Sequence, residues 1–207
     1  LARVNPYKHC LKIVSVTLIL ILFGLTIRSG FIVTYKNGDT PVEMLVYTQT
    51  SPDVPQLAKL ISTIGLKTGN TPTVDVDSTS GFQWPWAWYL RDIALAGYPQ
   101  YGQHLPSSML EQQVLIIHSQ NKLAIQEPVK EKYGEGQRFR HRWWFPEHTY
   151  RDLSLKKIVI SIFDRAAWIR AKDYFLYRDL DHKLSSEDAY VYFDDFEMRK
   201  FSLLELE

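Results

Sequence analysis

The sequence predicts an α/β protein, with an N-terminal transmembrane helix followed by one three-layer α/β domain whose mostly parallel sheet has about five strands. An uncharged apolar run, Ile13–Ile27, predicts the transmembrane helix. After it, short apolar segments alternate with segments of helical periodicity, which is typical of a parallel sheet covered by helices. The single cysteine, Cys10, has no partner, so no disulfide or cysteine-based metal site is expected. We expect two units, residues 1–35 with the helix and its flanks, and residues 40–207 with the α/β domain.

The run Ile13–Ile27 contains no charge and no proline. With Leu11, and with Lys12 reaching toward the headgroups, it approaches the roughly 17 to 20 residues that a helix needs to cross the hydrocarbon core. A signal peptide would need small residues at a cleavage site, and residues 28–31 are a poor match. A buried core helix is the remaining alternative.

The charges near this run predict an orientation. Arg3, Lys8 and Lys12 precede the run, and no acidic residue lies among residues 1–12. The positive-inside rule then favours residues 1–12 in the cytoplasm and residues 40–207 as an extracytoplasmic domain beside the lipid bilayer. The net charge of +1 gives no global attraction for nucleic acid, which we do not expect as a partner.

The first half of the domain shows a strand, a helix and a second strand. Residues 44–47 resemble a buried strand, and Ser51 with Pro52 forms a good helix start. Apolar residues keep helical spacing from Val54 onward, and residues 73–77 predict the next strand. This order favours parallel pairing.

The second half contributes three further strands and more helix. Residues 113–118 form the clearest strand, and a short helix from residue 121 should stop before Pro128. Residues 139–144 alternate basic and aromatic side chains, which predicts an edge strand protected by charge. One or two helices should cover residues 154–180, and residues 189–193 predict a last strand at a sheet edge.

Three tryptophans within five positions mark the segment from Trp84 to Asp92. On a helix beginning near Gln83, Trp84 and Trp88 share one face, with Arg91 and Asp92 one turn further on. Flat rings stack on the apolar face of a sugar, and Arg–Asp pairs bind its hydroxyls, so this pattern favours a glycan site. Burial in the core, or a position in the aromatic belt of a membrane interface, is the alternative.

Two aspartates follow predicted strand ends. Asp53 follows the first strand and Asp77 the second, and ligands of open α/β sheets bind at this rim. We therefore expect Asp53, Asp77, Trp84, Trp88, Arg91 and Asp92 as glycan-binding candidates. Asp75 with Asp77 could hold a divalent cation, but acids at the end of an exposed strand are common and we predict no metal.

The motifs of several enzyme classes are missing from the sequence. It has no G-x-G-x-x-G, no G-K-S/T and no G-x-S-x-G, and its six histidines show no paired metal spacing. We expect no cofactor and assign no catalytic residue, so the candidate rim is interpreted as a binding site.

Three segments carry a resemblance: residues 47–55 (YTQTSPDVP), 84–92 (WPWAWYLRD) and 142–147 (RWWFPE). Together they resemble the C-terminal outer domain of archaeal and bacterial multi-spanning proteins identified as flippase-associated in N-glycosylation. Those proteins are similar to protein mannosyltransferases and other GT-C glycosyltransferases. The resemblance covers roughly residues 10–195 and implies a polyprenyl-phosphate sugar as donor. The catalytic carboxylate of GT-C enzymes lies in the first outer loop, to which nothing here corresponds, so this chain would be accessory.

Three hypotheses follow. The chain is the terminal span and outer domain of a lipid-linked-sugar glycosyltransferase, a single-pass accessory subunit of a larger membrane complex, or a soluble enzyme with residues 13–27 as a core helix. The first predicts many apolar spans encoded before Leu1, and the second predicts other membrane subunits as partners.

Overall fold

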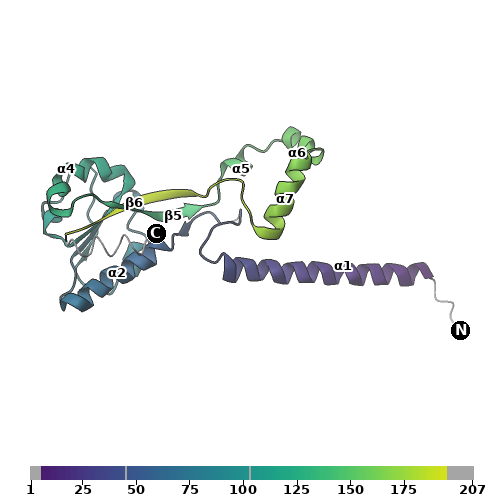
Figure 1. The fold of residues 1–207 in the computed structure, drawn as a ribbon, viewed down its shortest axis with the longest axis horizontal. Coiled ribbons are helices and arrows are strands. Elements are labelled where there is room, and N and C mark those ends of the chain that lie inside the picture. The colour runs from purple at the N-terminus through teal and green to yellow at the C-terminus, as the bar shows by residue number, and fades with distance from the viewer. Residues whose placement is uncertain (1–5, 45, 103, 195–207) are drawn as a thin grey trace.

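The computed structural model describes residues 6–44, 46–102 and 104–194. It shows a long N-terminal helix, an α/β domain, and a group of helices that two long strands connect to that domain (Figure 1). In chain order the main elements are α1 (Pro6–Phe31), η1 (Ile32–Lys36), β1 (Gln49–Thr50), α2 (Asp53–Thr68), β2 (Val74–Val76), η2 (Thr79–Gly81), α3 (Trp86–Tyr89), β3 (Ala96–Gly97), η3 (Ser107–Glu111), β4 (Val114–His118), η4 (Ser119–Asn121), α4 (Lys122–Tyr133), β5 (Gln137–Trp144), α5 (His148–Arg151), α6 (Leu155–Ile162), α7 (Arg165–Tyr177) and β6 (Ser185–Phe193).

The N-terminal helix projects away from the domain (Figure 1). α1 continues into the π-helical turn η1, and over Tyr7–Lys36 it is long and apolar enough to cross a membrane, by length and composition. Its 30 residues extend for about 45 Å at about 1.5 Å per residue. None of its most apolar stretch is buried against the rest of the protein. A core helix would be covered by other elements, so the structure does not support that alternative.

The sheet of the domain is mixed. Its six strands lie in the order β1-β5-β6-β4-β2-β3. β2 pairs in parallel with β3 and with β4, whereas β4–β6, β6–β5 and β5–β1 are antiparallel. The α/β class is therefore confirmed, but a mostly parallel sheet of about five strands is not. The extra antiparallel pairing arises because β5 and β6, separated by the helices α5–α7, return alongside each other.

Several predicted strands differ in position. The strand expected at residues 44–47 is not formed at residues 44, 46 and 47, and residue 45 lies outside the described residues. Met44 and Tyr47 are exposed, and the strand found in this part of the chain is the short β1. β6 is longer than expected and lies inside the sheet, between β5 and β4, instead of at an edge. Residues 139–144 also have partners on both sides, although β1 covers only their last part. Periodicity identifies which residues alternate, but it does not give the order of strands.

Helices cover both faces of the sheet, which gives the three layers expected. α2 and α3 pack on one face, and α4 packs on the other (Figure 1). On the first face, Ile61 and Trp86 are fully buried against strand residues such as Ile116. On the second face, Leu115 and Ile125 are fully buried together.

The helices of the domain follow the expected signals with two exceptions. α2 begins after Pro52 and ends at Gly69, whose positive φ of 69° suits a residue without a side chain. α4 runs through Pro128 to Tyr133 instead of stopping before the proline. α3 is a single turn, shorter than the helix expected through Asp92.

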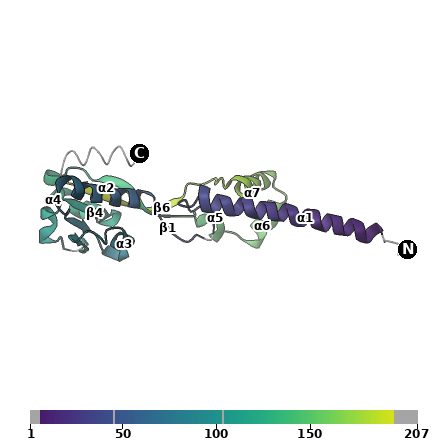
Figure 2. The same cartoon turned by 90° about the horizontal axis from the view of Figure 1, so that it is seen from below.

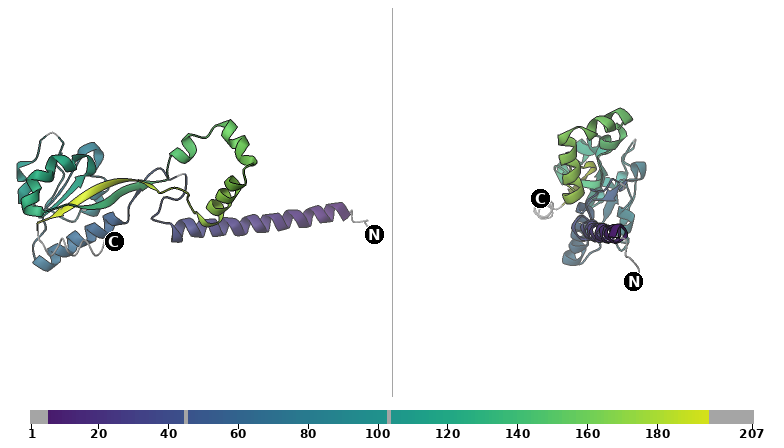
Figure 3. Two further views of the ribbon diagram at one scale, coloured as in Figure 1. Left: turned by 45° about the horizontal axis from the view of Figure 1, so that its top comes forward. Right: turned by 90° about the vertical axis from the view of Figure 1, so that its right-hand side faces the viewer.

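The helices α5–α7 form what we call the helical arm, residues 148–177. Figures 2 and 3 show the arm level with the half of α1 that is nearer the domain; the end of α7 comes close to α1, whereas α6 stands away from it (Figure 1). At its base, the guanidinium of Arg28 donates a hydrogen bond to the carbonyl of Leu176, and the Tyr174 hydroxyl donates to the carbonyl of Val42 at 3.1 Å. The arm is thus fixed to the end of the N-terminal helix.

Candidate functional site

Asp77 lies at the carboxyl end of β2, buried under the loops that leave the sheet. Its Oδ1 accepts hydrogen bonds from the backbone N–H groups of Thr79 at 2.9 Å and Tyr101 at 3.4 Å. Its Oδ2 accepts from the N–H of His118 at 3.3 Å and from Nδ2 of Asn121 at 2.7 Å. The carboxylate therefore fixes three loops, and it presents no free oxygen to a ligand.

His118, at the end of β4, connects this edge to β6. Its Nδ1 accepts a hydrogen bond from the N–H of Gln120 at 3.0 Å, so the ring proton is assigned to Nε2. Nε2 lies 2.6 Å from Oε1 of Glu187, whose Oε2 lies 2.9 Å from Nη2 of Arg142. The hydrogen bond from His118, and next the charge of Arg142, lower the pKa of Glu187 despite its partial burial.

A hollow of about 270 Å³ opens beside Arg142 and Glu187. Its other lining residues are Tyr47, Thr48, Trp144 and Glu147. A polar ligand in this hollow could donate hydrogen bonds to the ionised carboxylate of Glu187 and accept hydrogen bonds from the guanidinium of Arg142. With its pKa lowered, Glu187 is a weak proton acceptor near neutral pH, so this arrangement suits binding better than acid–base catalysis.

A β-bulge in β5 lies next to this cluster. Pairing with β6 shifts between Arg140 and Arg142, which leaves His141 as the extra residue. Oδ2 of Asp53 accepts a hydrogen bond from the N–H of Arg140 at 2.9 Å. Asp53 therefore supports the bulge through the start of α2, and the structure does not place it with Asp77 in one open site.

The bulge holds His141 fully inside the protein. Its ring centroid lies 4.0 Å from that of Phe82 and 6.2 Å from the nearly parallel ring of Trp86. Neither ring nitrogen has a hydrogen-bond partner of ordinary geometry. Burial, and next the charge of Arg142, lower the pKa of His141 to about 3, although Glu187 acts in the opposite direction.

The tryptophan segment has a buried side and an exposed side. Trp86 is fully buried together with Leu90, whereas 61% of Trp84 and 63% of Trp88 are exposed. The guanidinium of Arg91 lies 4.5 Å from the centroid of a Trp88 ring and donates to the carbonyl of Trp88 at 2.8 Å. This stacking orders both side chains at the surface.

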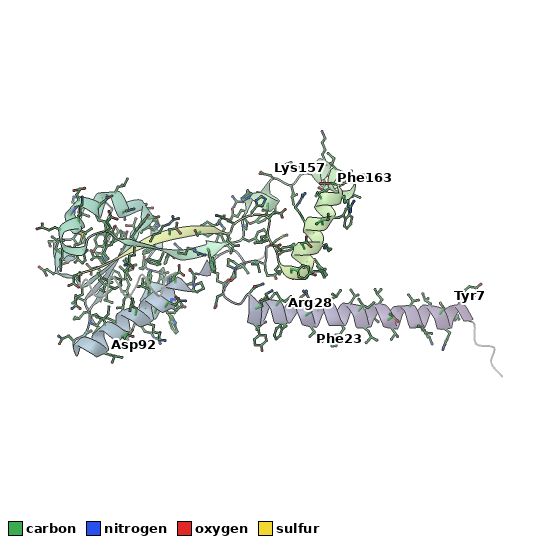
Figure 4. All side chains as sticks on the ribbon, viewed as in Figure 1. Tyr7, Phe23, Arg28, Asp92, Lys157 and Phe163 are labelled. Carbon is green, nitrogen blue, oxygen red and sulfur yellow. The ribbon has the colours of Figure 1, made fainter. Side chains whose placement is uncertain are left out.

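Asp92 completes this surface. Its carboxylate lies 3.7 Å from Nη2 of Arg91 and is mostly exposed. Figure 4 shows Asp92 on the α/β domain, far from the helical arm. Of the six candidate residues, the structure places Trp84, Trp88, Arg91 and Asp92 on one exposed segment. Their role in binding a glycan remains a prediction.

A cavity of about 850 Å³ lies under the helical arm. Apolar and aromatic side chains from α5 and its flanking segments and from α7 supply much of its lining, including Phe145, Tyr150, Leu153, Trp168, Tyr174 and Phe175. Arg170, also in the lining, forms ion pairs with Asp164 at 3.7 Å and Asp181 at 3.3 Å. The sequence predicted neither this cavity nor the cluster around Glu187, because each depends on how β5 and β6 come together.

Among the described residues, no three His, Cys, Asp or Glu side chains are grouped so that they could hold a metal ion. Asp75 accepts a hydrogen bond from the hydroxyl of Tyr101 at 3.2 Å, and burial raises the pKa of its carboxyl.

Comparison with protein-family models, curated proteins and solved structures gives no match to this chain. The resemblance to GT-C outer domains therefore has no support from these comparisons, and function is argued from geometry.

Proposed function

We propose that this chain is a membrane-anchored outer module that binds carbohydrate, as part of a lipid-linked-sugar (GT-C type) glycosyltransferase or of a flippase-associated protein. The single observation that carries the proposal is the exposure of Trp84 and Trp88, with Arg91 stacked on the second ring. We assign the chain an accessory, glycan-binding role and no catalytic residue. A glycan carried by a polyprenyl phosphate would be its ligand.

The N-terminal helix supports the membrane anchor. Tyr7 and Tyr35 are exposed at its two ends, 28 residues apart, which corresponds to about 42 Å along the helix axis. A bilayer with its interfacial regions is about 40 to 45 Å thick, and tyrosine favours both interfaces. Arg3, Lys8 and Lys12 lie before the apolar run, and the positive-inside rule therefore favours a cytoplasmic location for residues 1–12.

The tryptophan surface supports carbohydrate as the ligand. An exposed indole costs free energy in water, because its large apolar face remains hydrated. Sugar rings present C–H groups that cover such a face, and the hydroxyls at their edges match the donors of Arg91 and the carboxylate of Asp92. The hydrogen bond from Arg91 to the carbonyl of Trp88 reduces the entropy lost on binding, because it orders the side chain beforehand.

The test is binding of mannose, glucose and N-acetylglucosamine trisaccharides to the full chain in detergent micelles, measured by calorimetry. Trp88→Ala should abolish binding of the trisaccharide that the wild type recognises. Trp168→Ala is the matched control, since Trp168 is 62% exposed but lies on the helical arm. Equal binding by both variants would remove Trp88 from the site, and no binding of any trisaccharide by the wild type would contradict the carbohydrate proposal.

The alternative is a single-pass accessory subunit of a larger membrane complex. The observation that favours it is the extent of exposed apolar side chains on the helical arm, which a neighbouring subunit could cover. Co-purification of the full chain with a stable assembly in mild detergent would support this alternative.

A further inference from the structure

We infer that the helical arm is a second membrane-contacting element, which inserts its tip among the acyl chains of the outer leaflet beside α1. This inference rests on the proposed function in one respect, namely that α1 crosses the bilayer. The tip consists of α6 and the turn into α7, residues 155–168. Lipid acyl chains, and not another protein, surround this tip.

The position of the arm carries the first part of the inference. Figure 4 shows Phe163 and Lys157 of the arm level with the half of α1 that carries Arg28 and Phe23. Because α1 is the segment that crosses the bilayer, anything that lies beside its length lies at membrane depth. The contact between Arg28 and the carbonyl of Leu176 joins the base of the arm to α1.

The side chains of α6 carry the second part. Its apolar residues point away from the rest of the protein, and all are about half exposed or more: Leu155, Ile158, Val159, Ile160 and Ile162. Phe163, which follows them, is 86% exposed. Leu155, Ile158, Val159 and Ile162 lie on one stripe of α6, and the lysines lie off it. A short amphipathic helix of this kind lies at the boundary between headgroups and acyl chains, with its apolar face toward the acyl chains.

Several polar groups at the tip are paired within the arm. Ser161 donates its hydroxyl to the carbonyl of Lys157 at 2.8 Å, and Trp168 donates its indole N–H to the carbonyl of Ile162 at 2.8 Å. Ser154 accepts from the N–H of Lys157, which caps the start of α6. Each of these bonds removes a donor or acceptor that would otherwise enter the hydrocarbon unpaired.

The charges of the arm fit a position near the headgroups. Arg170 on α7 is paired with Asp164 and Asp181 within the arm. The ammonium of Lys157 donates a hydrogen bond to the carbonyl of Asp152 at 2.9 Å. The long aliphatic stem of Lys156 allows its ammonium group to reach the phosphate layer while the apolar face of α6 remains among the acyl chains. At eight residues, α6 is about 12 Å long, so it is too short to cross the bilayer and reaches one leaflet only.

The experiment uses the full chain in phosphatidylcholine–phosphatidylglycerol vesicles. Cys10 is replaced by serine, and one cysteine at a time carries an environment-sensitive fluorophore at position 163, 23 or 123. Phe163→Cys reports on the arm and Phe23→Cys on α1. Leu123→Cys, at an 82% exposed position on α4, is the matched water-facing control. Lipids with a nitroxide on the acyl chain and aqueous iodide serve as quenchers.

At position 163 we expect a blue-shifted emission, quenched by the lipid nitroxide as at position 23 and protected from iodide. Position 123 should show the opposite behaviour. Lipid quenching at 23 but iodide quenching at 163 would overturn the inference and leave the anchor intact. Protection of 163 from both quenchers would also overturn it, since protein would then cover the tip. Iodide quenching at both 23 and 163 would contradict the anchor itself.

Discussion

Acidification should destabilise the domain through His141, the buried residue of the β-bulge. The native ring titrates with a pKa of about 3, whereas a histidine in the unfolded chain titrates near pH 6.5. Between these values the unfolded state binds a proton that the native state does not, so stability falls as the pH drops below about 6.5. The free energy of unfolding should fall by about 1.4 kcal/mol per pH unit within this window. From pH 7 to pH 5 the loss from this one group is about 2 kcal/mol.

His141→Phe isolates this contribution. A phenyl ring suits the space between Phe82 and Trp86 and carries no proton. Urea unfolding of the full chain in detergent micelles, followed by tryptophan fluorescence at pH 7 and pH 5, gives the stability of each variant. The variant should lose about 2 kcal/mol less than the wild type over this interval.

The matched control is His104→Phe, because His104 is exposed. It should lose as much stability on acidification as the wild type does. Glu187, whose pKa is lowered in the native state, loses its stabilising contribution as the pH falls below about 4.3, which is below the interval from pH 7 to pH 5. If His141→Phe and the wild type lose the same free energy between pH 7 and pH 5, the account of His141 is refuted.

Two further predictions concern close packing and buried charge. Gly136→Ala should lower the free energy of unfolding by about 1 to 3 kcal/mol, because a Cβ there would lie 2.3 Å from the ring of Tyr192. Gly102→Ala is the control and should be nearly neutral, because a Cβ at Gly102 meets nothing within 4 Å. Asp77→Asn should lower the free energy of unfolding by about 2 to 4 kcal/mol, because the amide nitrogen would face hydrogen-bond donors. Asp92→Asn, on the surface, is the control and should change the free energy of unfolding by less than about 0.5 kcal/mol. Urea midpoints measure both pairs, and a loss equal to that of the control contradicts either argument.

The sequence predicted the local features that depend on periodicity. Trp84 and Trp88 were expected on one face of a helix beginning near Gln83, and both are exposed, although α3 is a single turn that does not include Trp84. The alternation of β5 is confirmed in the same way, since Phe139 and His141 are buried. These features depend only on neighbours along the chain.

The features that the sequence did not predict depend on pairing between distant segments. Glu187 meets His118 and Arg142 only because β6 lies between β4 and β5, and no local pattern specifies that order. Asp53 was expected at a ligand-binding rim, but it bonds to the N–H of Arg140 at a bulge whose position no pattern indicated. The exposure of α6 was missed for a similar reason, since an apolar helix has the same sequence whether protein or lipid surrounds it.

The ribbon formed by β5 and β6 separates the α/β domain from the helical arm. The two strands remain paired from Gln137 with Val191 to Trp144 with Ser185, so the arm is carried at the end of a stiff spacer. Lengthening both strands by two residues would preserve which side chains face inward and would add about 7 Å to this spacer. The length of the ribbon therefore sets the distance between the helical arm and the α/β domain.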